Sequence, residues 1–412
     1  MTGFGMRSPR SRLVTVMGVA VAVATGLIFI AGCVTSADGA STPPTSLPPL
    51  VATGDPTATS DSLATSDVEP TDTASAASIE TAATTSVPAS TSSAPAETSS
   101  TVAFEPVSYD ALRAAGAALG DDNLAVSISV WRGGTRDFSF TSGARGDGRA
   151  VGPDTPFVIA SVSKLVTALS IARLVEEGRI DLFDPVPWDD MGVQHDAAWE
   201  ATTVRQLLAH TSGIPEVRKS WLDDPGPCSI PLQQAMAAPP TTTRGRWKYS
   251  NGNYCALGLL VEHLTGMDLD DAAYDLVFRP AGITGPYLSV DGLHASSVPY
   301  PKGLARLERL GGAGTWLAST DDIAAMLAAV TADDRVTLEW PGIIVDQYGW
   351  GHTGTLDGAE ACAWLLQDSR TVITAFVSGS KPNTGGKVCD RVVPALATDL
   401  GIDAGDPVRN PD

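Results

Sequence analysis

The sequence predicts an α/β fold of the α+β type, in which an antiparallel sheet flanked by helices forms one lobe and carries an inserted all-α lobe. Two observations predict it. Strand-like segments lie near both ends of the folded part, as a hairpin pattern at 123–141 and as two adjacent apolar runs at 361–378. Between them, apolar residues recur at helical spacing, most clearly at 165–177 and 251–265. The two chain ends are therefore expected to close the sheet around the helical lobe.

Several of the expected elements have a clear local signal. The apolar segment 123–131 continues across Gly133-Gly134 into 135–141, which is typical of a β-hairpin. Ser319, followed by Thr320-Asp321-Asp322, indicates a helix N-terminus. In chain order we expect a helix at 109–120, strands at 123–131 and 135–141, helices at 165–177, 203–210, 232–237, 251–265, 269–278 and 319–330, strands at 361–366 and 371–378, and a helix at 388–400.

The folded domain is expected at residues 106–405, a length that can enclose a large core. The whole chain has 412 residues, with 47 acidic against 27 Lys and Arg side chains and a formal net charge of −20. This acidity argues against a nucleic-acid partner and against electrostatic attachment to anionic lipid.

Residues 1–33 are expected to be a targeting segment. Arg7, Arg10 and Arg12 precede an uncharged apolar run, and the run ends at Ile30-Ala31-Gly32-Cys33, which resembles a bacterial lipobox. Cleavage would make Cys33 the lipid-bearing N-terminus of a lipoprotein. An uncleaved transmembrane anchor is the alternative. Both interpretations place the remainder on the extracytoplasmic face of the membrane, because positive charges stay inside.

Residues 34–105 are expected to be a disordered linker and residues 406–412 a C-terminal tail. The linker is dominated by Ser, Thr, Ala and Pro and has scattered acidic residues. Such a composition cannot bury enough apolar surface to offset the entropy of the chain. The linker would let the domain reach from the membrane into the cell wall.

Four cysteines lie beyond Cys33. An even number in an exported protein predicts two disulfides, and sequential pairing of Cys228 with Cys255 and of Cys362 with Cys389 is favoured because each closes a short loop. Free buried thiols are the alternative. The sequence has no Cys-x-x-Cys or His-Glu-x-x-His pattern, and its five histidines are dispersed. We therefore expect neither a metal nor a cofactor.

Ser161 and Lys164 are the first chemical element. They lie one turn apart at the start of the helix expected at 165–177, so the hydroxyl and the amine share a helical face near the positive helix end. This arrangement suits a serine nucleophile with an adjacent amine. The same pattern recurs at Ser378-Gly379-Ser380-Lys381, but turn residues follow it, and we interpret this second copy as a loop.

Two further elements follow along the chain. Tyr249-Ser250-Asn251 precedes a helix, where a phenol near an ammonium could act as a base and a carboxamide could hold the lysine; an ordinary helix cap is the alternative. His352-Thr353-Gly354 precedes a strand, where a glycine would let a substrate backbone approach and a histidine would face the cleft. A simple β-turn with a surface histidine is the alternative.

Taken in order, these elements resemble the serine β-lactamase and penicillin-binding protein superfamily, in its branch of class C β-lactamases, D-alanyl-D-alanine carboxypeptidases, D-aminopeptidases and esterases. The resemblance covers nearly the whole folded domain. It is carried by the three elements together with Leu207–Pro215, Tyr249–Gly266, Phe278–Ile283, Gly311–Gly314, Ser319–Asp322 and His352–Thr355.

The resemblance implies an active site between the two lobes. Ser161 would be the acylated nucleophile, Lys164 its proton partner, and Tyr249 the general base for acylation and the acid to the leaving group. Asn251 would orient Lys164 and the acyl amide. The remaining residues His352, Thr353, Gly354 and Thr355 would line the cleft, with the main-chain N–H groups of Ser161 and Thr355 as the oxyanion hole.

The sequence therefore predicts a lipid-anchored serine hydrolase of the cell envelope, most specifically a D-Ala-D-Ala carboxypeptidase acting on peptidoglycan peptides, with β-lactams as inhibitors. An esterase or β-lactamase acting on a small ester or amide, and a non-catalytic binding protein, are the alternatives. His210 is expected to shape a turn, and no glutamate is identified as a deacylation base. Because His352 would titrate near neutral pH, acylation is expected to depend on pH between about 5.5 and 7.5.

Overall fold

The computed structural model describes residues 104–216, 226–240, 244–288, 296–300, 307–331, 334, 343–379 and 387–402. The targeting segment with Cys33, all but the end of the expected linker and the tail at 406–412 lie outside these residues. The chain divides into two units, 1–95 and 96–412, and the described residues belong to the second. Within the described part, no helix combines the length and apolar character needed to cross a membrane.

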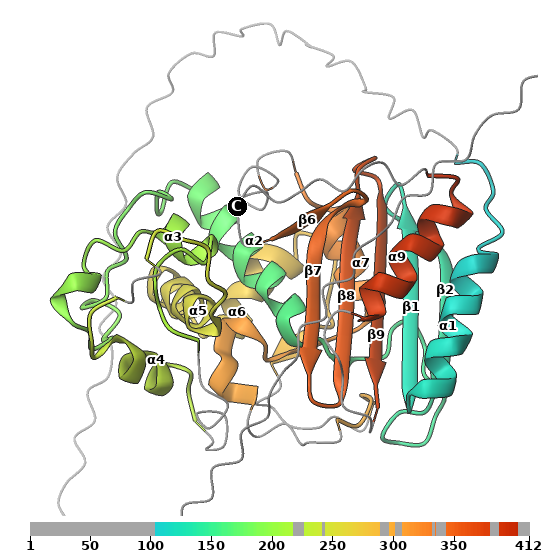
Figure 1. The fold of residues 1–412 in the computed structure, drawn as a ribbon, viewed down its shortest axis with the longest axis horizontal. Coiled ribbons are helices and arrows are strands. Elements are labelled where there is room, and N and C mark those ends of the chain that lie inside the picture. Colours follow the sequence, from blue (N-terminus) through green and yellow to red (C-terminus); the bar gives the residue numbers. More distant parts are fainter. Residues whose placement is uncertain are drawn as a thin grey trace, which may run out of the picture. The chain divides into compact units, whose positions relative to one another are not determined.

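A six-stranded antiparallel sheet forms one layer of the domain, in the order β2-β1-β9-β8-β7-β6 (Figure 1). Chain ends that are far apart in sequence meet at its centre, because β1 pairs with β9 along its whole length. This confirms the fold predicted from strands at both ends of the domain. The strands are β1 (Ala125–Arg132), β2 (Thr135–Gly143), β6 (Ile344–Asp346), β7 (Gly349–Leu356), β8 (Ala359–Leu366) and β9 (Thr371–Ser378).

Both faces of this sheet are covered by helices, which explains why β8 and β9 are apolar along their whole length. Helices α1 (Asp110–Asp122) and α9 (Lys387–Asp399) contact each other and one face. The α9 disulfide (Cys362–Cys389) joins α9 to β8. On the opposite face lies α7 (Thr320–Ala328), whose N-terminus is closed by the expected signature, a capping box between Ser319 and Asp322.

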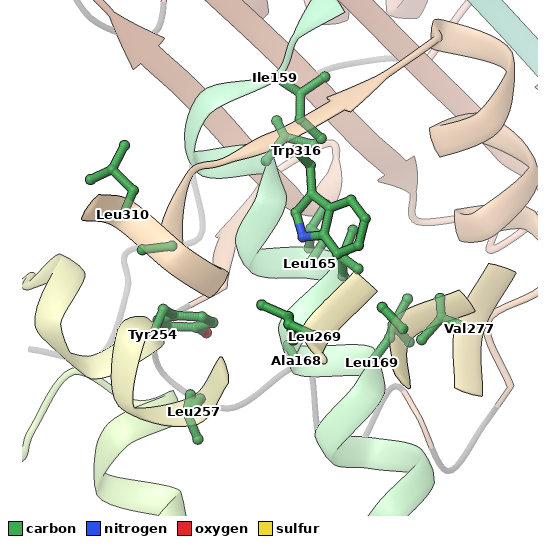
Figure 2. Packing of buried hydrophobic residues seen from close by; sticks show 14 of the residues in the cluster. Ile159, Leu165, Ala168, Leu169, Tyr254, Leu257, Leu269, Val277, Leu310 and Trp316 are labelled. Atoms are coloured by element: carbon green, nitrogen blue, oxygen red, sulfur yellow. The ribbon is translucent and has the colours of Figure 1, made fainter. Parts of the chain in front are cut away.

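The helical lobe surrounds α2 (Ser163–Glu176) and α5 (Asn251–Thr265), which contact each other. Trp316 is completely buried in the core beside α2, and Figure 2 shows its ring near Ile159 and Leu165. The other elements of this lobe are α3 (Val204–Leu208), α4 (Ser229–Met236), α6 (Leu269–Ala273), the π-helical turn η4 (Tyr274–Phe278) and the 3-10 segment η6 (Leu307–Ala313). The α5 disulfide (Cys228–Cys255) joins the start of α4 to α5.

The structure differs from the expected elements at β7, because residues 352–354 were expected to precede a strand and instead lie within one. The other differences are mainly at short elements. A second, three-stranded sheet of β3 (Phe157–Val158), β5 (Trp316–Ala318) and β4 (Tyr287–Leu288) was not expected. Its strands have two or three residues, too few to show a period of two in the sequence. The helix expected at 269–278 changes its winding at Tyr274, where α6 passes into η4.

Candidate active site

Ser161 lies in a single 3-10 turn, η1 (Ala160–Val162), between β3 and α2. The preceding residue, Ala160, has a φ of 48°, which is strained for a residue with a Cβ. Strand β7 packs on this turn through Gly354: a Cβ there would lie 2.3 Å from the Ile159 carbonyl oxygen. From the sequence, Gly354 was expected to leave room for a substrate backbone. This reason is corrected, because the turn of the chain that holds Ser161 is what approaches Gly354.

Lys164 is completely buried on the first turn of α2. Its Nζ donates to Asn251 Oδ1 at 2.7 Å and to the Ala313 carbonyl at 2.7 Å, and it lies 3.2 Å from Ser161 Oγ. Burial lowers the pKa of this amine from 10.5 to about 7, and the Glu216 carboxylate opposes that shift. At neutral pH a large share of the lysine is therefore uncharged.

The hydrogen bonds of Lys164 fix the direction of its lone pair. A neutral amine has two N–H groups and one lone pair, and a carboxamide or carbonyl oxygen can only accept. Asn251 Oδ1 and the Ala313 oxygen therefore take both N–H groups. The lone pair is left to face Ser161 Oγ, as a base for the hydroxyl proton requires.

Tyr249 lies on the other side of Ser161, with its hydroxyl oxygen 2.9 Å from Ser161 Oγ and 3.4 Å from Asn251 Oδ1. Burial raises the pKa of the Tyr249 phenol above its ordinary value of 10.0. The expectation of a phenolate base is therefore corrected: the phenol stays protonated, and Lys164, whose pKa is lowered, is the better proton acceptor. As a protonated phenol, Tyr249 can donate a hydrogen bond to a neighbouring oxygen.

Tyr249-Ser250-Asn251 includes a helix cap and also contributes side chains to the site, although these two interpretations were predicted as alternatives. Ser250 is the N-cap of α5, and its Oγ accepts the Gly252 N–H at 3.2 Å. Asn251, the first residue of the helix, turns its side-chain oxygen to Lys164. Because the cap fixes where the helix begins, it also fixes the positions of the residues on both sides of it.

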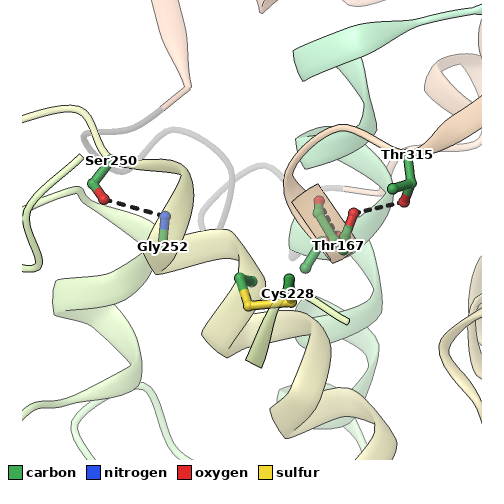
Figure 3. The surroundings of a disulfide bond; sticks show 8 residues. Thr167, Cys228, Ser250, Gly252 and Thr315 are labelled. Carbon is green, nitrogen blue, oxygen red and sulfur yellow. Dashed lines mark hydrogen bonds between the residues drawn. A yellow bond between two sulfur atoms is a disulfide. The ribbon is translucent and has the colours of Figure 1, made fainter. Parts of the chain in front are cut away.

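The segment that carries the Ala313 carbonyl is fixed by a hydrogen bond from Thr167 and by packing against a disulfide. Thr167 Oγ1 donates to the Gly312 carbonyl at 2.8 Å, and Gly311 has a φ of 48°. A Cβ on Gly311 would lie 2.5 Å from Cys228 Sγ, so the α5 disulfide packs directly against this segment (Figure 3). The structure contains the sequential disulfide pairing that was predicted, but the packing of the α5 disulfide against the segment that binds Lys164 could not be foreseen from it.

Strand β7 places its residues differently from the expectation. His352 is almost fully buried, and burial lowers its pKa to about 3. Its Nδ1 pairs with the Thr353 carbonyl, so this nitrogen carries the ring proton. His352 is thus neutral near pH 7 and cannot supply positive charge or a titration between pH 5.5 and 7.5. Thr353 and Thr355 alternate with His352 and Gly354 along the strand and face the other side of the sheet.

Two residues around Asn251 and Tyr249 were not identified as functional. His210, expected to shape a turn, has a φ of 53°, and its ring centroid lies 4.6 Å from that of Tyr249. Its Nδ1 accepts from the Ser250 N–H and the Asn253 amide. Glu216 accepts two hydrogen bonds from Asn251, at 2.8 Å from the backbone N–H and 2.7 Å from Nδ2. No local pattern marks Glu216, because its partners are far along the chain.

The other candidates lie apart from this group or outside the described residues. Ser378 ends β9 and donates to the Pro299 carbonyl, while Ser380 and Lys381 are not among the described residues. Within the described part, no group of three or more His, Cys, Asp or Glu side chains could hold a metal ion.

Comparison with known proteins identifies the family. The family model described as Beta-lactamase matches residues 112–398. The chain belongs to the β-lactamase family. It thereby falls in the superfamily of β-lactamases and penicillin-binding proteins.

Among curated β-lactamase relatives, penicillin-binding protein 4 of Amycolatopsis lactamdurans is 34% identical over 151 residues, which cover 34% of this chain and 38% of the relative. Unguisins hydrolase ungD' of Aspergillus campestris is 27% identical over 170 residues, which cover 37% and 31%. The chain thus spans about a third of the length of these relatives.

Among solved structures, a D-stereospecific amidohydrolase from Streptomyces sp. matches with a TM-score of 0.57 at 23% identity, over 68% of this chain and 97% of that one. The D-amino acid amidase from Ochrobactrum anthropi SV3 matches with a TM-score of 0.60 at 19% identity, over 70% and 99%. These two similarities support the β-lactamase fold.

Proposed function

We propose that this β-lactamase family member forms an acyl-enzyme on Ser161 and hydrolyses amide or peptide bonds of D-amino acids in the cell envelope. One observation carries the proposal: Ser161 Oγ lies 3.2 Å from Lys164 Nζ and 2.9 Å from the Tyr249 hydroxyl. A nucleophile held between a buried amine and a phenol can lose its proton to the first and exchange protons with the second.

In the proposed reaction, the neutral Lys164 amine takes the Ser161 proton as Oγ attacks the substrate carbonyl. The negative charge that develops on the carbonyl oxygen would be stabilised by the main-chain N–H groups of Ser161 and Thr355, where one donor contributes roughly 3 kcal/mol. As the tetrahedral intermediate collapses, the bond from the carbonyl carbon to the leaving group breaks and the Tyr249 hydroxyl gives its proton to the leaving group. The Lys164 ammonium then restores that proton through Ser161 Oγ, which lies within hydrogen-bond distance of both groups. Water then releases the acyl group by the same steps in reverse order.

Two substrate classes are compatible with this chemistry. The D-alanyl-D-alanine carboxypeptidase type, with β-lactams as inhibitors, is supported by relatives named as penicillin-binding proteins. The D-amino-acid amide type is supported by the carboxylate of Glu216 beside Asn251 and by the names of the structural neighbours. An esterase or β-lactamase would use the same Ser161 chemistry.

The proposed location is the extracytoplasmic face of the membrane. The penicillin-binding relatives support an association with the cell envelope. The lipobox-like segment ending at Cys33 is the sequence feature that supports a lipid anchor, with residues 34–105 as the spacer.

The proposed nucleophile can be tested by mass spectrometry of the full-length chain after treatment with a fluorophosphonate or a penicillin. We expect one covalent adduct on Ser161, and none in Ser161→Ala. Absence of an adduct with either reagent would contradict the proposal and favour a non-catalytic binding protein. Comparing kcat/KM on a D-Ala-D-Ala peptide and on a p-nitrophenyl ester then separates the carboxypeptidase from the esterase.

A further inference from the structure

Glu216 accepts hydrogen bonds from both the backbone and the side chain of Asn251. Its Oε2 accepts the backbone N–H of Asn251, the first residue of α5, and its Oε1 accepts from Asn251 Nδ2. The positive end of the 15-residue helix α5 favours a carboxylate at this place. Hydrogen bonds therefore run without interruption from Ser161 through Lys164 and Asn251 to Glu216.

This arrangement changes what Asn251 can offer a substrate. The resemblance implied that the Asn251 side chain would contact an acyl amide, but Oδ1 accepts from Lys164 and Nδ2 donates to Glu216. Asn251 Nδ2 keeps a second N–H for an acyl oxygen, but a carbonyl oxygen placed there would also lie beside the carboxylate oxygens of Glu216, and two acceptors cannot pair. An N-acyl group is therefore poorly matched to this side of the site.

The charges around the site favour a cation at the same place. When the Lys164 amine is neutral, the neighbouring imidazoles of His210 and His352 add no positive charge, because burial lowers the pKa of both. Lys248 is exposed and acts on Glu216 from the segment before Tyr249. The Glu216 side chain has exposed surface through which a ligand can reach it, while partial desolvation raises the pKa of its carboxyl group and the hydrogen bonds from Asn251 oppose that shift.

We propose that Glu216 binds the free α-ammonium group of the substrate, so that the preferred substrates are amides or esters of amino acids with an unblocked amine. The proposal rests on the proposed acyl-Ser161 chemistry and selects the second of its two substrate classes. In an acyl-enzyme the α-nitrogen is only about 2.5 Å from the acyl carbon. The hydrogen-bond chain from Ser161 passes through Lys164 and Asn251 to Glu216, and the proposal places the amine of the bound residue on the Glu216 side of this chain.

The test compares D-alanine p-nitroanilide, which has a free amine, with its N-acetyl derivative, using the full-length chain. Wild-type kcat/KM should be higher for the free amine. Glu216→Gln should lower kcat/KM for the free amine by at least roughly tenfold more than for the N-acetyl substrate, because a charge-assisted hydrogen bond to the substrate is lost only in the first case, whereas any displacement of Asn251 affects both substrates. Glu216→Asp, which keeps the charge, should retain the preference.

Three outcomes would overturn the proposal. The first is a wild-type preference for the N-acetyl substrate. The second is an equal fall of kcat/KM for both substrates in Glu216→Gln, which would mean that Glu216 only positions Asn251. The third is a loss of the free-amine preference in Glu216→Asp. Labelling of Ser161 by a fluorophosphonate in each variant distinguishes the two levels of the proposal. If Ser161 is labelled, only the ammonium subsite fails. If the wild type is not labelled, the acyl-enzyme chemistry fails as well.

Discussion

Acylation of Ser161 should depend on the protonation state of Lys164 and become faster as the pH rises through about 7. Burial lowers the pKa of the Lys164 ammonium to about 7, and only the neutral amine can accept the Ser161 proton. With this pKa, roughly a tenth of the amine is neutral at pH 6 and roughly nine tenths at pH 8. We therefore expect kcat/KM to rise about tenfold between these two pH values.

The assay is kcat/KM for an uncharged p-nitrophenyl ester, corrected for spontaneous hydrolysis, from about pH 5 to about pH 9. His352→Asn is the matched variant, because His352 has a pKa lowered to about 3 and stays neutral over this range. The inflection near pH 7 should persist in that variant. A flat wild-type profile between pH 6 and 8, or an inflection that disappears with His352, would refute the assignment of Lys164 as the base.

Three further predictions follow from the same contacts. Lys164→Met should abolish turnover but raise the free energy of unfolding. Below pH 7, burying an amine whose pKa falls from 10.5 to about 7 costs the wild type roughly 5 kcal/mol of folding free energy. The stability that Lys164→Met gains, measured by urea denaturation, should therefore shrink as the pH rises from 7 to 10.5. A gain that grows over this range would contradict the prediction. Replacing either disulfide by two serines should lower the free energy of unfolding by about 3.5 kcal/mol, because both disulfides close loops of sequence separation 27. At a temperature where both variants are folded, only loss of the α5 disulfide should also lower kcat/KM. Gly354→Ala should lower kcat/KM about 100-fold, because the Ile159 carbonyl and the turn that holds Ser161 must shift. The control variant Gly120→Ala in α1 should leave activity unchanged. Equal activities of the two variants would show that the turn tolerates the shift.

The sequence alone was sufficient for the fold and for the family to which the chain belongs. Strands at both ends of the domain and helices between them predicted a sheet closed by the chain termini, and the pairing of β1 with β9 confirms this. The signal was strong because side chains on strands and helices follow periods that can be counted in the sequence. The order of Ser161, Lys164, Tyr249 and His352-Thr353-Gly354 pointed to the β-lactamase and penicillin-binding protein superfamily, which the family match confirms.

Only the tertiary structure decided the charge states in the site. From the sequence, His352 was expected to titrate near neutral pH and Tyr249 to act as the base, whereas burial lowers the pKa of His352 to about 3 and raises that of Tyr249. Glu216 was not identified from the sequence, because its carboxylate binds Asn251 across 35 residues of chain. A residue's type sets its ordinary pKa, but desolvation and partners distant in sequence set the pKa in the fold, and neither has a period or spacing along the chain.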